Sequence, residues 1–293
     1  MRIVAGLLAI LSFALPIAAQ QKLAFDVASA RENKSVEGPG GEPPQTNVPL
    51  GPGDVYSPTG GQLNIRNMGF LLLVSFAYRM TIPQQDAFRD MAPKWVTEAR
   101  FDIQARTDKT DVTKDELRLM MRSLLADRFG LAVHYENRTA SVYSLQLLKP
   151  GTFGPHFRKH TGTCSKDFKG KTTVDADADG YPEVCGGLLL LSGSASTHFR
   201  IGARDMPITV FATSLTGWGD LGRPVVNDTG ITGNIDFALD FIPPYAQAAA
   251  AGADVDGQGF QEALHKQLGV KLESQKQPVP VLVLDHIERL SEN

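Results

Sequence analysis

Two segments of the chain, residues 128–149 and 267–288, carry the same order of apolar and polar positions. They align without a gap, and the alignment places Gly130 on Gly269. In each segment the glycine ends a helical pattern, and the residues after it alternate as the residues of strands do. The pattern therefore predicts the same passage from helix to strand twice in one chain.

Two further pairs of segments repeat in the same order: residues 63–78 with 201–215, which places Met68 on Met206, and residues 101–103 with 235–237. Repetition at this scale indicates duplication of a supersecondary unit. We expect an α+β fold, a tandem duplication of a strand-helix-strand-strand-helix-strand-strand unit with antiparallel-rich sheets.

The first unit is expected to span residues 22–149, with a Gly/Pro-rich surface excursion over 31–61 that cannot be regular helix or central strand. Thr113 followed by Glu116 predicts a capping box at the start of its second helix, which ends near Gly130. The expected elements are strands 25–29 and 62–65, a helix over 68–80, a hairpin of 95–96 with 101–105, the helix after Thr113, and an antiparallel pair of 131–135 with 142–148.

The second unit is expected to span residues 197–293, after an insertion over 150–196. Pro207 opens its first helix, a position where a missing N–H costs nothing. The Ala/Gly-rich residues 243–259 are expected to form a flexible loop. The other expected elements are strand 199–203, a hairpin of 224–226 with 235–241 joined by 227–234, helix 260–268, and strands 270–273 and 281–286.

The chain begins like an exported protein. Residues 1–19 combine a basic start, an apolar run and small residues before a cleavage point, as a secretory signal peptide does; an uncleaved anchor stays open. No later segment is long and apolar enough to span a membrane. Cys164 and Cys185 are the only cysteines, and in an exported protein they are expected to form a disulfide. We expect a periplasmic or cell-surface location.

Several phrases carry a family resemblance: FDVASARE from Phe25, LLADRFGLAVHYENR from Leu124, GRPVVNDTGITGNIDFALDF from Gly222, and VLVLDHIERLSEN at the end. With these phrases the chain resembles a soil-associated, exported protein family of acidobacteria, which is built on a domain of unknown function. The resemblance covers essentially the whole mature chain. It implies export, many paralogues and no established activity. The repeated unit is also similar in topology to the small N-terminal modules of secretins and TonB-type proteins.

Two loops were considered as metal sites. His156, His160 and Cys164 are spaced four apart, but the nearby glycines argue against the helix that would align them, and a disulfide would occupy the cysteine. The acidic run offers weak calcium candidates: Asp175, Asp177, Asp179 and Glu183. The expected bidentate glutamate is replaced by Gly186, so the more favoured interpretation is an acidic loop without a cofactor.

A catalytic site has only weak support. His134 and His286 fall at nearly equivalent strand positions, and so do Asp102 and Asp236. A hydrolase-like enzyme would use His134, Asp102, His286 and Asp285 between the units. No motif places a nucleophile, and the chain has no G-x-S-x-G, H-E-x-x-H, G-x-G-x-x-G or P-loop pattern.

The favoured hypothesis is a non-catalytic envelope module that binds a protein or peptide in a groove between the units or at a sheet edge. The turn with Asp228, Thr229, Gly230 and Gly233 is the candidate partner-binding loop, although a tight structural turn is the simpler interpretation. The formal net charge of −3, with acidic and basic residues mixed, argues against nucleic-acid binding. The alternatives are the hydrolase-like enzyme and a calcium-stabilised surface protein.

Overall fold

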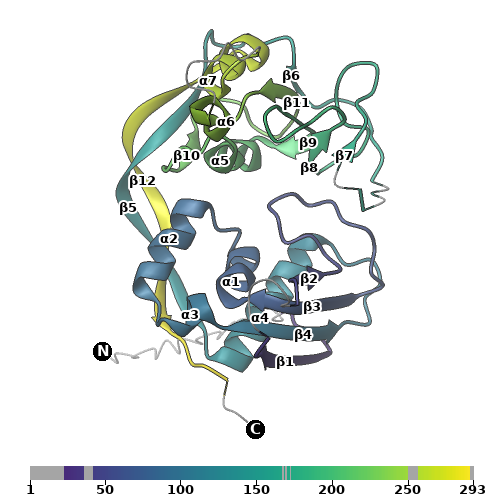
Figure 1. Ribbon diagram of the computed structural model, residues 1–293, viewed down its shortest axis with the longest axis vertical. Helices are drawn as coiled ribbons and strands as arrows, with labels where there is room; N and C mark the ends of the chain where they lie inside the picture. The colour runs from purple at the N-terminus through teal and green to yellow at the C-terminus, as the bar shows by residue number, and fades with distance from the viewer. Residues whose placement is uncertain are drawn as a thin grey trace, which may run out of the picture.

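A long two-stranded ribbon runs along one side of the molecule and joins two lobes of mixed α and β structure (Figure 1). In the computed structural model, residues 23–35, 42–166, 168, 170–171, 173–249 and 257–290 are described. The expected signal peptide, residues 1–19, lies outside them. The fold is α+β with antiparallel-rich sheets, as the sequence predicts. Within the described residues, no helix is both long and apolar enough to cross a membrane.

The first lobe, at the bottom of Figure 1, is a four-stranded antiparallel sheet covered by helices. Alternating side chains of its third strand are buried, as the sequence pattern requires for a sheet with one covered face. The sheet order is β1 (Val27–Asn33), β4 (Arg100–Arg106), β3 (Gln62–Gly69) and β2 (Gln45–Thr46), and the helices are α1 (Phe70–Tyr78), α2 (Ile82–Met91), α3 (Trp95–Glu98) and α4 (Lys114–Phe129).

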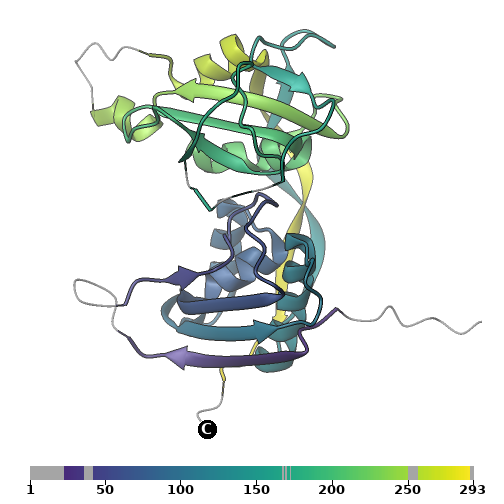
Figure 2. The same cartoon turned by 90° about the vertical axis from the view of Figure 1, so that its right-hand side faces the viewer.

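The second lobe contains a five-stranded sheet and its own helices (Figure 2). The sheet order is β6 (Phe157–Lys159), β11 (Asn234–Phe241), β9 (Phe199–Pro207), β8 (Leu188–Leu191) and β7 (Thr173–Val174). The helices are α5 (Ile208–Trp218), α6 (Pro244–Ala249) and α7 (Phe260–Ala263), which continues as the π-helical turn η1 (Leu264–Leu268). Each lobe has a separate hydrophobic core, built around Phe70 and Phe129 in the first and Phe211 and Phe237 in the second.

The same local features recur in the two lobes. Gly130 and Gly269 both end a helix at positive φ, 57° and 70°. Asn67 and Asp205 both have positive φ, 48° and 54°, one residue before the aligned methionines. Thr113 and Glu116 form the predicted capping box at the start of α4.

The ribbon corrects one expectation of the sequence. Residues 131–135 and 142–148 do not pair with each other; they lie on one strand, β5 (Ala132–Leu147). Residues 270–273 and 281–286 likewise lie on one strand, β12 (Val270–His286), and β12 pairs antiparallel with β5 over its whole length. The intervening residues contain no glycine turn, so an extended backbone continues through them.

Both expected hairpins were also wrong. Trp95 lies in the short helix α3, which begins just after Pro93, and therefore does not pair with residues 101–105. Val225 belongs to β10 (Val225–Asn227), which pairs in parallel with β5, so residues 227–234 cross from one sheet to another. Part of the Ala/Gly-rich loop is helical, as α6, and its residues 250–256 lie outside the described part.

Candidate ligand-binding cleft

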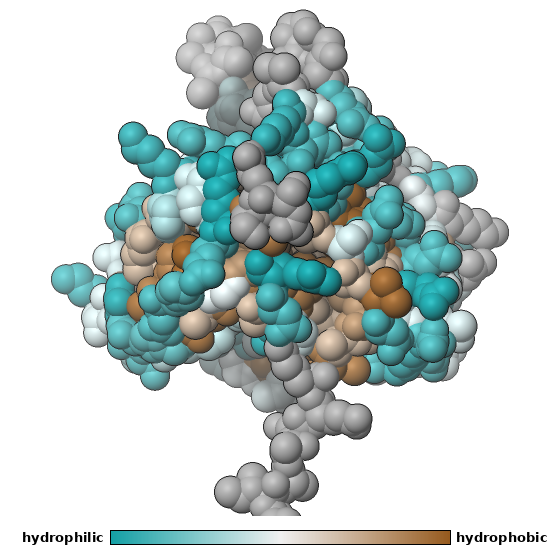
Figure 3. All heavy atoms as spheres, turned by 90° about the horizontal axis from the view of Figure 1, so that it is seen from below, coloured by the Kyte–Doolittle hydropathy of each residue, from teal (hydrophilic) through white to brown (hydrophobic). Residues whose placement is uncertain are grey.

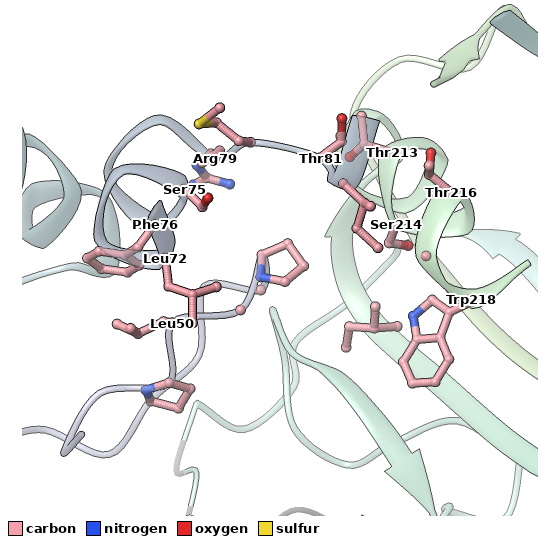
Figure 4. Close-up of a pocket in the computed structure, with 18 of the residues that line it drawn as sticks. Leu50, Leu72, Ser75, Phe76, Arg79, Thr81, Thr213, Ser214, Thr216 and Trp218 are labelled. Carbon is pink, nitrogen blue, oxygen red and sulfur yellow. The ribbon is translucent and has the colours of Figure 1, made fainter. Parts of the chain in front are cut away.

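A cleft of about 940 Å³ lies between the two lobes. It is lined by α1, the start of α2 and the 49–55 loop of the first lobe, and by α5, β8 and the start of α6 of the second (Figure 4). This volume is at the upper end of the range for ligand pockets. Because these helices, strands and loops belong to both lobes, the walls of the cleft come from segments far apart in the sequence.

Large apolar side chains stand exposed in this cleft. Leu72, Ile82 and Tyr245 have relative exposures of 48%, 55% and 56%, and all three line it. Trp218 adds aromatic surface on the α5 wall, and Phe76, a buried residue, lies in the opposite wall (Figure 4). The end of the first lobe that faces away from the cleft shows a band of apolar residues surrounded by hydrophilic ones (Figure 3). A concentration of exposed apolar side chains in a concave surface is typical of a binding site.

Two buried cations on α4 shape one wall. The Lys114 ammonium donates hydrogen bonds to the backbone carbonyls of Gly51 (2.9 Å) and Gly53, and the Arg118 guanidinium donates to the carbonyls of Pro52 (3.1 Å) and Gly53 (3.2 Å). Both side chains are 2% exposed. The Gly/Pro-rich excursion, which cannot satisfy its carbonyls by regular pairing, is thereby held as a fixed wall of the cleft.

The same end of the cleft carries a small excess of positive charge. Arg118 pairs with Asp54 (2.8 Å) and Asp115 (2.9 Å), and Arg79 pairs with the same two carboxylates. Burial, and then repulsion by Arg118, lower the pKa of Lys114 to about 7. Three basic groups therefore face two acidic ones, and an anion nearby would stabilise the charged form of Lys114.

The opposite wall, on α5, offers hydroxyl groups. Thr213 and Ser214 donate to carbonyls of their own helix, at 3.1 Å and 2.7 Å. Thr216 is 4% exposed and lines the cleft, yet its hydroxyl has no hydrogen-bond partner among the described residues. The oxygen of this hydroxyl is itself buried, so it is an unpaired polar atom within the wall and not a group exposed to the cleft.

The candidate catalytic residues lie elsewhere. On the ribbon His134 contacts Asp285 (Nδ1 to Oδ1, 2.8 Å), and both side chains are nearly half exposed. Hydrogen bonds that the His134 ring donates to the carboxylates of Asp285 and then Glu136 raise the pKa of His134. His286 contacts Glu288 instead, at 2.9 Å. None of these residues lines the cleft.

Asp102 belongs to a separate cluster in the first lobe. Its carboxylate accepts hydrogen bonds from the side chains of Asn33 (2.8 Å) and Arg31 (3.3 Å) and from the backbone N–H of Asn67 (2.9 Å). Burial alone would raise the pKa of Asp102, but these hydrogen bonds outweigh it and lower the pKa. The structure thus brings His134 and Asp285 together and leaves His286 and Asp102 apart from them.

The calcium candidates mostly contact protein groups. Asp177 pairs with Arg204 and accepts hydrogen bonds from the backbone N–H groups of Asp179 (3.0 Å) and Tyr181 (3.1 Å). Asp179 pairs with Arg158 at 3.2 Å. Asp175 accepts a hydrogen bond from the Ser192 hydroxyl, and Glu183 is exposed. Guanidinium groups thus lie where a cation would be expected to bind two of these carboxylates.

Cys164 and Cys185 form a disulfide that closes a loop on the second lobe. Phe168 on this loop, and Gly187 to Leu189 just after it, reach the wall of the cleft. His156 is exposed, whereas His160 is largely buried with Nδ1 2.7 Å from the carboxylate of Asp236.

The candidate partner-binding loop is bonded to the ribbon. The carboxylate of Asp228 accepts hydrogen bonds from the Ser144 hydroxyl (2.5 Å) and the Gln277 amide (2.7 Å). Thr229 donates to the Asn227 side chain, and Gly230 and Gly233 have φ of 72° and 86°. The left-handed backbone explains both glycines. The loop is not among the segments that line the cleft.

Sequence analysis missed Lys114, Arg118 and Thr216. A signal was present for the first two, because Lys114 and Arg118 continue the stripe of Leu117 and Met121 at helical spacing on α4. A basic residue on a buried stripe requires a buried acceptor. No comparable signal marks Thr216, whose burial depends on the contacts around α5.

The family description "Protein of unknown function (DUF3738)" matches residues 71–287, and the chain therefore belongs to this family. No curated protein and no solved structure matches the chain. Membership in an uncharacterised family agrees with the resemblance read from the sequence.

Proposed function

We propose that this family member is an exported, non-catalytic binding protein whose cleft between the lobes holds a peptide segment. The segment presents large apolar side chains to the cleft and a carboxylate to its basic end. The observation that carries the proposal is the exposure of Leu72, Ile82 and Tyr245 in one cleft between the lobes. Covering such side chains contributes roughly 25 cal/mol per Å² of apolar surface removed from water.

Charge and hydrogen bonding favour a peptide acid as the occupant. Arg79, Lys114 and Arg118 outnumber their partners Asp54 and Asp115, so a carboxylate at this end balances the local charge. The Thr213 and Ser214 hydroxyls line the α5 wall among apolar side chains, and a peptide supplies both backbone N–H groups that can donate to these hydroxyls and apolar side chains.

The arrangement of the lobes supports the same function. We propose that the lobes arose by tandem duplication, with units at 22–149 and 197–293 and the 150–196 insertion between them. The insertion also supplies β6, which pairs with β11 as β1 pairs with β4. Two related lobes joined by a ribbon form a cleft at their junction, and ligand sites often lie between domains.

Export is part of the proposal. The signal-like residues 1–19 and the disulfide between Cys164 and Cys185 both fit an oxidising compartment, the periplasm or the cell surface. The soil-associated, acidobacterial origin read from the sequence phrases remains a prediction.

The test is a calorimetric titration of the protein with a synthetic hexapeptide. The peptide alternates leucine and serine and has a free C-terminal carboxylate. Leu72→Ser is expected to weaken binding about tenfold or more, because a leucine side chain contributes roughly 1.5–3 kcal/mol when it is covered. Leu119→Ser is the matched control: Leu119 is 45% exposed on α4 and lies outside the cleft. It is expected to leave binding unchanged.

The C-terminal amide of the same hexapeptide tests the basic end. We expect it to bind more weakly than the acid, and Arg79→Gln to reduce that difference. Binding of dodecanoate with no binding of the hexapeptide acid would contradict the peptide as occupant. Equal weakening by Leu72→Ser and Leu119→Ser would contradict the cleft as the site.

A further inference from the structure

The buried carboxylate of Asp236 organises a cluster at the edge of the second lobe. It is 0% exposed and accepts hydrogen bonds from Arg158 Nε (2.9 Å), from His160 Nδ1 (2.7 Å) and from the backbone N–H of Asp205 (3.0 Å). With Nδ1 donating to this carboxylate, the other ring nitrogen of His160, Nε2, has its lone pair free. A histidine held in this way is the usual form of a metal ligand, oriented by a carboxylate behind it.

The first lobe contains the same cluster with different side chains. The carboxylate of Asp102 accepts hydrogen bonds from the Arg31 side chain, the Asn33 amide and the backbone N–H of Asn67. The bonds from Asn33 and Asn67 both end at Oδ1 of Asp102. In the second lobe the bonds from His160 and Asp205 likewise both end at Oδ1 of Asp236. The residue that corresponds to Asn33 is His160, and the residue that corresponds to Asn67 is Asp205.

Amide side chains are therefore sufficient for the structural part of this arrangement. The second lobe replaces both amides with residue types that bind metal ions, namely a histidine and an aspartate. The side chains of the two corresponding residues also differ in their own contacts: Asp205 Oδ1 accepts a hydrogen bond from the Asn234 amide (2.7 Å), whereas Asn67 Oδ1 accepts one from Arg100 (2.8 Å).

Cys164 lies beside these two residues, and its disulfide brings Cys185 to the same place. Single donor atoms of His160, Cys164 and Asp205 all lie within 4.8 Å of one another, and Cys185 is bonded to Cys164. His160 Nε2 is 3.9 Å from the nearer Asp205 oxygen. Cys164 is partly exposed and lies between the exposed residues Thr163 and Ser165, so the disulfide is near the surface.

We propose that reduction of the disulfide converts this cluster into a zinc site with Cys164, Cys185, His160 and Asp205 as the four ligands. A dithiol reductant gives up two electrons and two protons, becomes a disulfide itself, and leaves two thiols in place of the S–S bond. Zinc then displaces both thiol protons. Two thiolates, one imidazole and one carboxylate match the tetrahedral donor set that zinc prefers, with bond lengths of about 2.0–2.3 Å.

Zinc and the disulfide are then alternative closures of one loop. Each joins the chain at residues 164 and 185, so the loop stays closed in an oxidising and in a reducing environment. The loop already contacts both strands, through the pair of Asp177 with Arg204 of β9 and the pair of Asp179 with Arg158 of β6. The zinc form would add Asp205 of β9 and His160, at the end of β6, to these contacts.

The test uses the mature chain, reduced and then freed of reductant under anaerobic conditions, and titrated with zinc against a chromophoric zinc chelator. We expect one zinc per reduced chain and none per oxidised chain. The variant H160N/D205N copies the first lobe; it is expected to keep its thermal midpoint in the oxidised form and to lose zinc binding in the reduced form. His156→Asn, which changes the exposed histidine of the same segment, is expected to bind zinc as the wild type does.

Cys185→Ser gives a second measurement that needs no reductant. It leaves Cys164, His160 and Asp205 free of the disulfide. We expect this variant to bind one zinc ion per chain, with lower affinity than the reduced wild type. Absence of zinc binding by the reduced wild type would overturn the proposal. So would zinc binding by H160N/D205N at wild-type affinity, which would show that the cysteines act without these two residues.

Discussion

At the scale of single residues, buried polar groups define the molecule. Lys114 and Arg118 are buried charges on α4, and both have their donors directed at carbonyls of the 51–53 loop. Asp102 and Asp236 are acceptors that tie an edge strand and a left-handed turn to the middle of each sheet. Each of these groups is costly to bury alone and stabilising only with its partners.

The lowered pKa of Lys114 predicts a pH dependence of stability. Its pKa is about 7 in the folded chain and 10.5 ordinarily, so between these values the unfolded chain holds a proton that the folded chain lacks. This group therefore makes the free energy of unfolding rise with pH, by up to about 1.4 kcal/mol per unit. Lys114→Met is expected to remove that contribution, as measured by urea unfolding from pH 7.5 to 9. The exposed Lys94→Met is the control, and an unchanged slope in Lys114→Met would contradict the account.

At the scale of elements, the ribbon is the feature that connects everything else. Leu145 of β5 and Val270 of β12 belong to the core of the second lobe, whereas Leu282 of β12 belongs to the core of the first. The ribbon is thus anchored at both ends. Its outer edge is β12, since the sheet order is β10, β5, β12.

Pro278 and Pro280 protect this edge. Successive N–H groups of a strand point to opposite edges, so residues 278 and 280 share one edge of β12. Because pairing with β5 continues through both prolines, the N–H groups that they lack belong to the outer edge. Gln84 of α2 covers the same edge by donating to the Pro280 carbonyl at 3.2 Å. Restoring two donors with P278V/P280V is expected to promote edge-to-edge dimers, detected by sedimentation velocity. A variant that stays monomeric at the concentrations where the wild type is monomeric would contradict this role.

Local signals predicted the elements better than their partners. Thr113, Glu116, Gly130 and Gly269 marked helix ends that the structure has, because caps depend on a few neighbouring residues. Alternation over residues 131–135 and 142–148 predicted strands, but it says which side chains face inward and not which strand lies beside them. The pairing of β5 with β12 therefore could not be predicted from the pattern.

At the scale of the whole molecule, the cleft exists only because two separate cores are held side by side. The sequence predicted a groove between units as one possible binding surface, but the residues that line it come from loops and helices far apart in the chain. The Gly/Pro-rich residues 49–53 were expected to be a surface excursion, and they form a wall because Lys114 and Arg118 hold them. The one sequence signal for this wall was the position of Lys114 and Arg118, which continue the apolar stripe of α4 and therefore require buried acceptors.

The most direct test of the account uses Trp218, which lines the cleft, in a chain where Trp95→Phe has removed the other tryptophan. We predict that adding the hexapeptide acid shifts Trp218 emission to shorter wavelength, as its ring leaves water, and that Leu72→Ser weakens this response while Leu119→Ser does not. Binding of the hexapeptide by calorimetry with no change in Trp218 emission would contradict the central claim, because the ligand would then lie outside the cleft.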